Sequence, residues 1–213
     1  MNTVFVECDD AARVADAVAD VFAAEGMCAC GTPPARERLP YDPMQYGTGA
    51  DNALWACALF PGAQAWIAVK TAPLELLCEP GARTGEMLLA AVCRVLGCAA
   101  VAVHLYDSSS MVLAEVSARG EVDVSGVNPQ SDDPLHWQGF EIGEDNYMPR
   151  SSRPELQPLL LAPSAETQAT AMVDLLGGAN APHCDNLTSV VALVQCLPVE
   201  AVGARTVYAA RRP

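Results

Sequence analysis

The sequence is short of positive charge. It contains one lysine, Lys70, and 12 lysines and arginines in all, against 26 aspartates and glutamates. The formal net charge is therefore −14. A field of this sign repels the phosphates of nucleic acids and of anionic membranes, so binding to either is not expected. The same field attracts basic proteins and speeds their encounter. The arginine-rich, lysine-poor composition is typical of a GC-rich bacterial genome.

An export signal and a long unbroken apolar run are also missing. The start, "MNTVFVECDD", lacks the basic and apolar regions of a signal peptide. The longest uncharged run, residues 53–69, is interrupted by Pro61-Gly62, so no transmembrane helix is expected. Because nine cysteines occur without an export signal, we expect a cytoplasmic protein with mostly reduced thiols.

Length and hydrophobic content predict one folded domain over residues 1–213. Hydrophobic residues make up 51% of the chain, which is enough to bury a core. We expect a sheet-and-helix core over 1–125 and an irregular, acidic, proline-rich segment over 126–163. We expect helices and a last strand over 164–213.

The patterns to residue 107 predict the order β-α-β-β-α-β. Strand patterns occupy 3–8, 54–60, 65–71 and 99–107, and apolar helical stripes lie between them. The first stripe, Val14, Val18, Val21 and Phe22, follows a cap at Asp9 or Asp10 and stops at Gly26. The second, Leu88, Val92, Val95 and Leu96, follows a cap at Thr84 and stops at Gly97.

The fold class expected from this order is α+β, a mainly antiparallel sheet with helices packed on it. The order itself is the ferredoxin-like, split-βαβ order. Strands at 111–118 and 121–126 extend it as a β-meander. Helical patterns at 164–178 and 187–197 predict a C-terminal helical pair, and "RTVYAA" predicts a last strand.

Common catalytic motifs are absent: no glycine-rich phosphate loop, no Gly-x-Ser-x-Gly and no His-Glu-x-x-His occurs. "PHCDN", residues 182–186, places a histidine, a thiol and a carboxylate together. Side chains of successive residues diverge, so the motif favours a helix start capped by Asp185 or Asn186 over a site with Cys184 as nucleophile. We predict no catalytic residue and no cofactor.

Single cysteines and polar residues in apolar stretches also favour structural roles. Cys28 and Cys30 are too close for a zinc-binding pair, and no second pair follows, so no metal is predicted. Cys57, Cys78 and Cys196 lie in apolar runs and are expected to be buried. His104 is expected to be half-buried and hydrogen-bonded. Glu115 is expected on a solvent-facing side of its strand.

One segment combines acids with aromatics. Between Gly120 and Pro149 there are seven acids and no lysine or arginine. Aromatic anchors and steering charges are typical of an interface for a basic protein, although the aromatics of an acidic surface loop can instead pack onto the core. The predicted partner-binding residues are Asp132, Asp133, Trp137, Phe140, Glu141, Glu144, Asp145 and Tyr147.

A further indication comes from "HLYDSSSMVLAEVSARGEVDVSGVNP", residues 104–129. Its Tyr106-Asp107 strand end, serine turn, Arg119-Gly120 turn and Asn128-Pro129 resemble a pattern in small bacterial immunity proteins of polymorphic toxin systems. The resemblance implies an inhibitor that occludes a cognate toxin and has no catalytic residues.

Three functions remain open from the sequence. The first is a protein-binding inhibitor that masks a basic toxin or effector through an acidic surface. The second is an enzyme whose active site is dispersed along the chain, most concretely with a Cys184 nucleophile. The third is a non-catalytic regulatory or structural subunit.

Overall fold

A computed structural model describes residues 2–29, 55–72, 75–106, 109–127, 135–142, 149–177 and 192–198. Its strands are β1 (Asn2–Glu7), β2 (Met27–Ala29), β3 (Trp55–Pro61), β4 (Trp66–Ala72), β5 (Ala100–Tyr106), β6 (Ser110–Val116), β7 (Val122–Val127), β8 (Leu135–Trp137), β9 (Phe140–Ile142) and β10 (Ala192–Pro198). Its helices are α1 (Ala11–Ala24), α2 (Leu88–Leu96) and α3 (Ala165–Leu175), with 3-10 turns η1 (Leu76–Cys78) and η3 (Gln157–Leu161).

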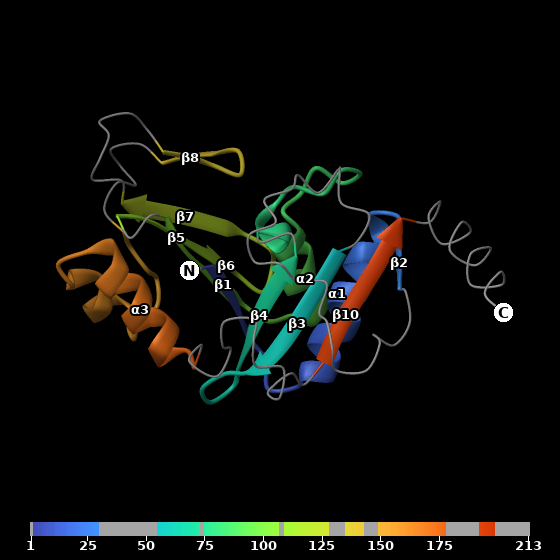
Figure 1. Cartoon of the computed structure of the whole chain (residues 1–213), viewed down its shortest axis with the longest axis horizontal. Helices are drawn as coiled ribbons and strands as arrows, with labels where there is room; N and C mark the ends of the chain where they lie inside the picture. Colours follow the sequence, from blue (N-terminus) through green and yellow to red (C-terminus); the bar gives the residue numbers. More distant parts are fainter. Residues whose placement is uncertain are drawn as a thin grey trace, which may run out of the picture.

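The expected β-α-β-β-α-β order forms the middle of one antiparallel sheet. The full strand order is β2-β10-β3-β4-β1-β5-β6-β7, and β8 and β9 form a separate hairpin. In the chain β1 precedes α1, and β3 follows it after the short strand β2. In the sheet β1 and β3 are separated by β4, and β4 and β5 are separated by β1 (Figure 1). These two split connections confirm the α+β, ferredoxin-like prediction.

The sheet grows beyond this unit at both edges. β6 and β7 continue from β5 as the predicted meander. On the other edge β10 pairs with β2 and β3, and sequence analysis predicted neither β2 nor β10. The predicted helix over 187–197 is therefore wrong over 192–197, which belong to strand β10, and its first residues, 187–191, lie outside the described residues. The other member of the expected helical pair is confirmed as α3, which Ser164 caps by accepting from the backbone amide of Thr167 at 3.2 Å.

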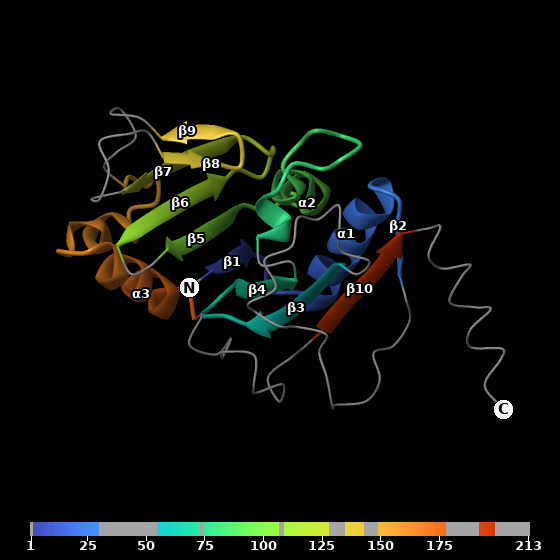
Figure 2. The ribbon, with the colours of Figure 1, turned by 45° about the horizontal axis from the view of Figure 1, so that its top comes forward.

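Helices cover both faces of the sheet, so the protein has three layers (Figure 2). Neighbouring residues of a strand point to opposite faces. Val4 and Val6 accordingly belong to the core formed with α1 and α2, whereas Phe5 belongs to the core formed with α3. No helix among the described residues is both long and apolar enough to cross a membrane.

Helix α1 begins and packs as its sequence predicts. The Asp10 carboxylate accepts from the backbone amides of Ala12 at 2.9 Å and Arg13 at 3.2 Å, which satisfies two free donors of the first turn. All four residues of the predicted apolar stripe are buried.

Helix α2 differs from its prediction at two positions. It starts at Leu88, and the Thr84 hydroxyl donates to the buried Glu25 carboxylate at 2.8 Å, so Thr84 does not cap the helix. Val95 is 57% exposed and lies outside the buried stripe, which includes Cys93 instead. Gly97 ends the helix in the left-handed region, at φ 66°, as predicted.

Candidate functional site

Polar side chains from three distant segments meet at the end of β5. His104 and Tyr106 are two residues apart on this strand and therefore share a face, the one covered by α1 and α2. Cys78 is the last residue of η1, and Glu75 directly precedes η1. Trp137 and Gln138 come from the β8–β9 hairpin. We call these six residues, Glu75, Cys78, His104, Tyr106, Trp137 and Gln138, the His104 cluster.

His104 lies at the centre of the cluster and is 1% exposed. Its Nε2 lies 3.4 Å from Cys78 Sγ. Its Nδ1 lies 3.7 Å from Glu75 Oε1, which is too long for a hydrogen bond, and no other described atom bonds it. His104 is hydrogen-bonded through Nε2, as expected, but it is buried and not half-buried, because η1 and the hairpin enclose the ring.

The Glu75 carboxylate connects the cluster. Oε1 accepts from the Tyr106 hydroxyl, and Oε2 accepts from Gln138 Nε2 at 3.0 Å. Burial raises the pKa of Glu75, but the neighbouring His104 and the hydrogen bonds from Tyr106 and Gln138 outweigh it and hold the pKa at about 2. Glu75 is therefore ionised at neutral pH.

The thiol of the cluster is held in its neutral form. Burial, with the charges of Glu75 and Glu79, raises the pKa of Cys78 well above its ordinary value. A thiol next to an imidazole, with a carboxylate on the far side of the imidazole, is the arrangement of a cysteine nucleophile and its base. In the arrangement seen here the trio is enclosed and its thiol is protonated.

Cys78 and His104 were separate candidates in the sequence, and Glu75 was not among the candidates. The residues of the trio are separated by up to 29 positions and by helix α2, so no local motif marks them. Only the pairing of β1 with both β4 and β5 predicts their closeness, because it brings the end of β5 near the chain that leaves β4.

The predicted partner-binding residues run from Asp132 to Tyr147, and the structure describes only the middle of this acidic-aromatic segment, over 135–142. Trp137 is 4% exposed and packs on His104, with ring centroids 5.2 Å apart. Its role as a partner-facing anchor is therefore corrected: the indole packs onto the core, as the alternative interpretation had it. Phe140 is half-buried beside Trp137, and Glu141 lies in β9. Asp132, Asp133, Glu144, Asp145 and Tyr147 lie outside the described residues.

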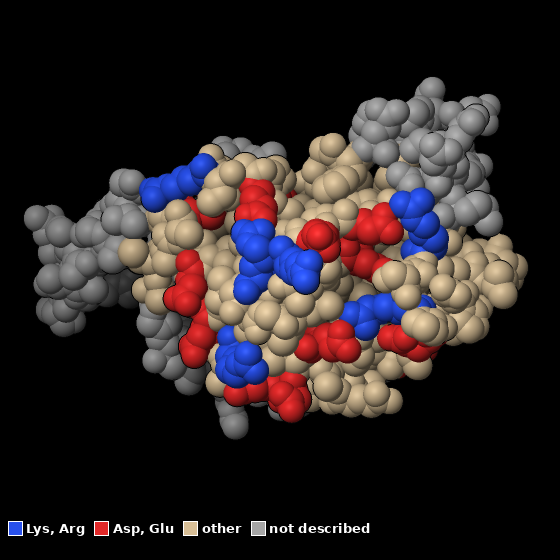
Figure 3. Space-filling view, turned by 180° about the vertical axis from the view of Figure 1, so that it is seen from behind, with Lys and Arg blue, Asp and Glu red and all other residues tan. Residues whose placement is uncertain are grey.

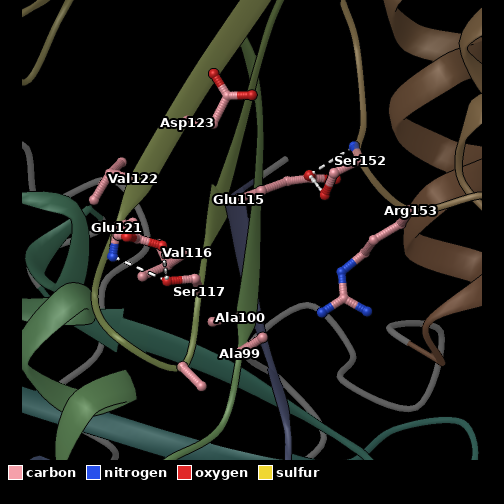
Figure 4. A pocket seen from close by; sticks show the side chains of 11 residues that line it. Ala99, Ala100, Glu115, Val116, Ser117, Glu121, Val122, Asp123, Ser152 and Arg153 are labelled. Carbon is pink, nitrogen blue, oxygen red and sulfur yellow. Dashed lines mark hydrogen bonds between the residues drawn. The ribbon is translucent and has the colours of Figure 1, made fainter.

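A second polar region is a pocket of about 420 Å³ between the β6–β7 turn and Arg153 (Figure 4). Glu115 lies in its wall and is buried, so the expectation that it faces solvent is wrong. Its carboxylate accepts from the Ser151 hydroxyl, from the Ser152 amide at 2.9 Å and from the Ser152 hydroxyl at 2.6 Å. The segment leading to α3 thus covers this side of β6.

Arg153 points toward the same pocket (Figure 4). Its guanidinium donates to Glu7 at 2.7 Å and to Glu155 at 3.4 Å, and it lies 4.6 Å from the centre of the Trp66 ring. Cation–π stacking and two ion pairs hold the group in place. The charged groups of Glu115 and Arg153 are both bound by other side chains and by the backbone of the protein. The pocket therefore lies where polar contacts hold the chain before α3 against the sheet.

No protein-family model, curated protein or solved structure matches this chain.

The remaining features of the sequence are the possible metal ligands, the cysteines and two motifs. In the part of the chain that the structure describes, no three or more histidines, cysteines, aspartates and glutamates are grouped to hold a metal ion. Free thiols are found at Cys8, Cys28, Cys78, Cys93 and Cys98, and burial is confirmed for Cys57 and Cys78. The "PHCDN" motif and "RTVYAA" lie outside the described residues.

Proposed function

We propose that this protein is a protein-binding inhibitor that masks a basic domain of another protein, as immunity proteins do to their toxins. The observation that carries the proposal is the docking of the β8–β9 hairpin by the buried Trp137. Binding segments are effective when a rigid scaffold fixes them. Here the scaffold fixes the middle of a segment whose acids precede it, at Asp132 and Asp133, and follow it, at Glu144 and Asp145.

The charge distribution supports a basic partner. The described ion pairs, such as Arg150 with Asp123 and Arg94 with Glu86, join basic groups to neighbouring acids. Figure 3 shows acidic and basic side chains next to one another on the face seen from behind. The chain has 26 acidic and 12 basic residues, so even if every base paired with one acid, 14 acids would have no basic partner within the chain. A cytoplasmic setting, supported by the many free thiols, belongs to the proposal.

Affinity capture from the native host tests the proposal. The wild-type chain and the double variant Glu144→Lys/Asp145→Lys serve as matched baits, and the product of a neighbouring gene is tested first. We expect a protein with a basic domain that binds the wild type. The variant should associate about tenfold more slowly, and the difference should shrink in high salt. A purified partner that binds both baits at equal rates contradicts the acidic interface.

A second function, an enzyme with a dispersed site, is favoured by one observation: the approach of Cys78, His104 and Glu75. In this candidate the Cys78 proton passes to His104 Nε2, sulfur attacks an acyl carbon, the leaving group takes that proton, and water releases the acyl group. The hairpin must first open to admit a substrate. Activity on fluorogenic thioesters that disappears in Cys78→Ser supports this candidate, and activity that survives in Cys78→Ser refutes it.

A further inference from the structure

One carboxylate fastens the β8–β9 hairpin to the sheet. Glu75 Oε2 accepts from Gln138 in the hairpin turn at 3.0 Å. Glu75 Oε1 accepts from the Tyr106 hydroxyl, whose oxygen in turn accepts from Trp137 Nε1 at 2.9 Å. Two neighbouring residues of the hairpin are thus connected to the same acid, one directly and one through Tyr106.

The backbone at Gln138 gives independent support. Gln138 has φ 49° and Gly139 has φ 86°, the left-handed conformations of a two-residue hairpin turn. Asparagine, aspartate or glycine adopts this region more easily than glutamine. The sequence therefore keeps a less suitable residue at a position where its side chain reaches Glu75.

We infer that Glu75 is a positioning residue for the proposed partner-binding segment, acting by holding the hairpin at its centre. The inference rests on the proposed function for the meaning of the segment, although the docking itself does not depend on any partner. Glu75 lies outside the segment in sequence, before α2. Its substitution therefore changes the presentation of the acids without changing them.

Cys78 reports the docking. It touches His104, which lies beneath Trp137, so release of the hairpin uncovers the thiol. Cys93 is a control in the same protein, because it is fully buried in α2 and becomes accessible only when the domain unfolds. Trypsin separates the two cysteines into adjacent peptides, residues 71–83 and 84–94, since it cleaves after Lys70, Arg83 and Arg94. Iodoacetamide labelling of both peptides is then quantified by mass spectrometry.

Two variants test the inference together. Glu75→Gln removes the charge and one acceptor oxygen, and should raise the labelling of Cys78 relative to Cys93 by about tenfold or more. Loss of this charge also lowers the pKa of Cys78, which by itself speeds labelling. Gln138→Asn avoids this effect, because it keeps Glu75 and suits the turn but is too short for the hydrogen bond. It should raise the ratio several-fold. Glu155→Gln changes an exposed acid just before η3, on the α3 side of the sheet, and should leave the ratio unchanged.

An unchanged ratio in Gln138→Asn overturns the inference, and so does an equal rise of both cysteines in Glu75→Gln, which would place the effect on the whole domain. An assay of partner binding tests the inference about Glu75 separately from the proposed function. If the ratio rises in both variants and a captured basic protein still binds them as it binds the wild type, Glu75 positions the hairpin but the hairpin is not the interface. If that protein binds the wild type and both variants bind it several-fold more weakly, the inference is supported.

Discussion

Trp137 Nε1 donates a hydrogen bond to the Tyr106 hydroxyl oxygen at 2.9 Å, which fastens the central aromatic of the acidic-aromatic segment to strand β5. The indole is 4% exposed and packs on His104. The largest side chain of the segment thus contributes to the core, so the proposed contacts with a partner are assigned to other residues of the segment.

Trp137→Ala should destabilise the protein by about 3–5 kcal/mol, because it removes a large buried ring and leaves a cavity. Trp137→Phe should cost less, since it keeps most of the packing and loses the hydrogen bond. Urea unfolding followed by circular dichroism gives both values. Equal stability of the alanine variant and the wild type would show that the indole is not part of the core.

The low pKa of Glu75 makes a prediction about acid. Its folded-state pKa, about 2, is below the ordinary value of 4.5, so the stability that its ionised form provides is complete above about pH 4.5 and is lost as pH falls toward 2. In that window the wild type should lose more stability than Glu75→Gln. Urea unfolding at a series of pH values measures the difference between the two proteins. Parallel curves would contradict the assignment.

Glu115 is predicted to be structural despite its place in a pocket. Glu115→Ala leaves the Ser152 amide and two hydroxyls without their acceptor, and should cost about 3 kcal/mol. Ser152→Ala removes one of these bonds and should cost about 1 kcal/mol. Glu121→Ala is a matched control, because this acid lines the same pocket but is exposed, and it should change stability by less than about 0.5 kcal/mol. A Glu115→Ala protein as stable as the control would place the carboxylate in solvent.

Local patterns predicted the elements whose contacts are close in sequence. Alternating apolar residues marked the β3–β4 hairpin and the meander, and Asp10 marked the start of α1. The helical period of Leu187, Val190, Val191, Val194 and Leu197 gave a wrong prediction over 192–197, which form part of strand β10. A short apolar run also fits a buried strand. The choice was made by pairing with β2 and β3, more than 130 residues away, and no local feature carries this information.

The candidate site depended even more on the fold. His104, Cys78 and Glu75 meet because β1 lies between β4 and β5. Trp137 was correctly singled out in the sequence, but it was predicted to face a partner and it faces the core. An aromatic residue among acids fits both an exposed anchor and a core contact. Burial separates the two interpretations, and it is decided by the packing of the hairpin on His104 and Tyr106.

Helix α2 offers a direct test of structure against pattern. Val95 and Leu96 both belonged to the predicted buried stripe, but Val95 is 57% exposed and Leu96 is 8% exposed. Val95→Lys should therefore change stability by less than about 0.5 kcal/mol, because the lysine lies in water. Leu96→Lys should cost several kcal/mol, about 3 or more, because it removes a packed side chain and forces a charge toward α1. Urea midpoints of the two variants decide the matter: similar large losses in both would mean that α2 is rotated from the position described, and with it Cys93, the control for Cys78.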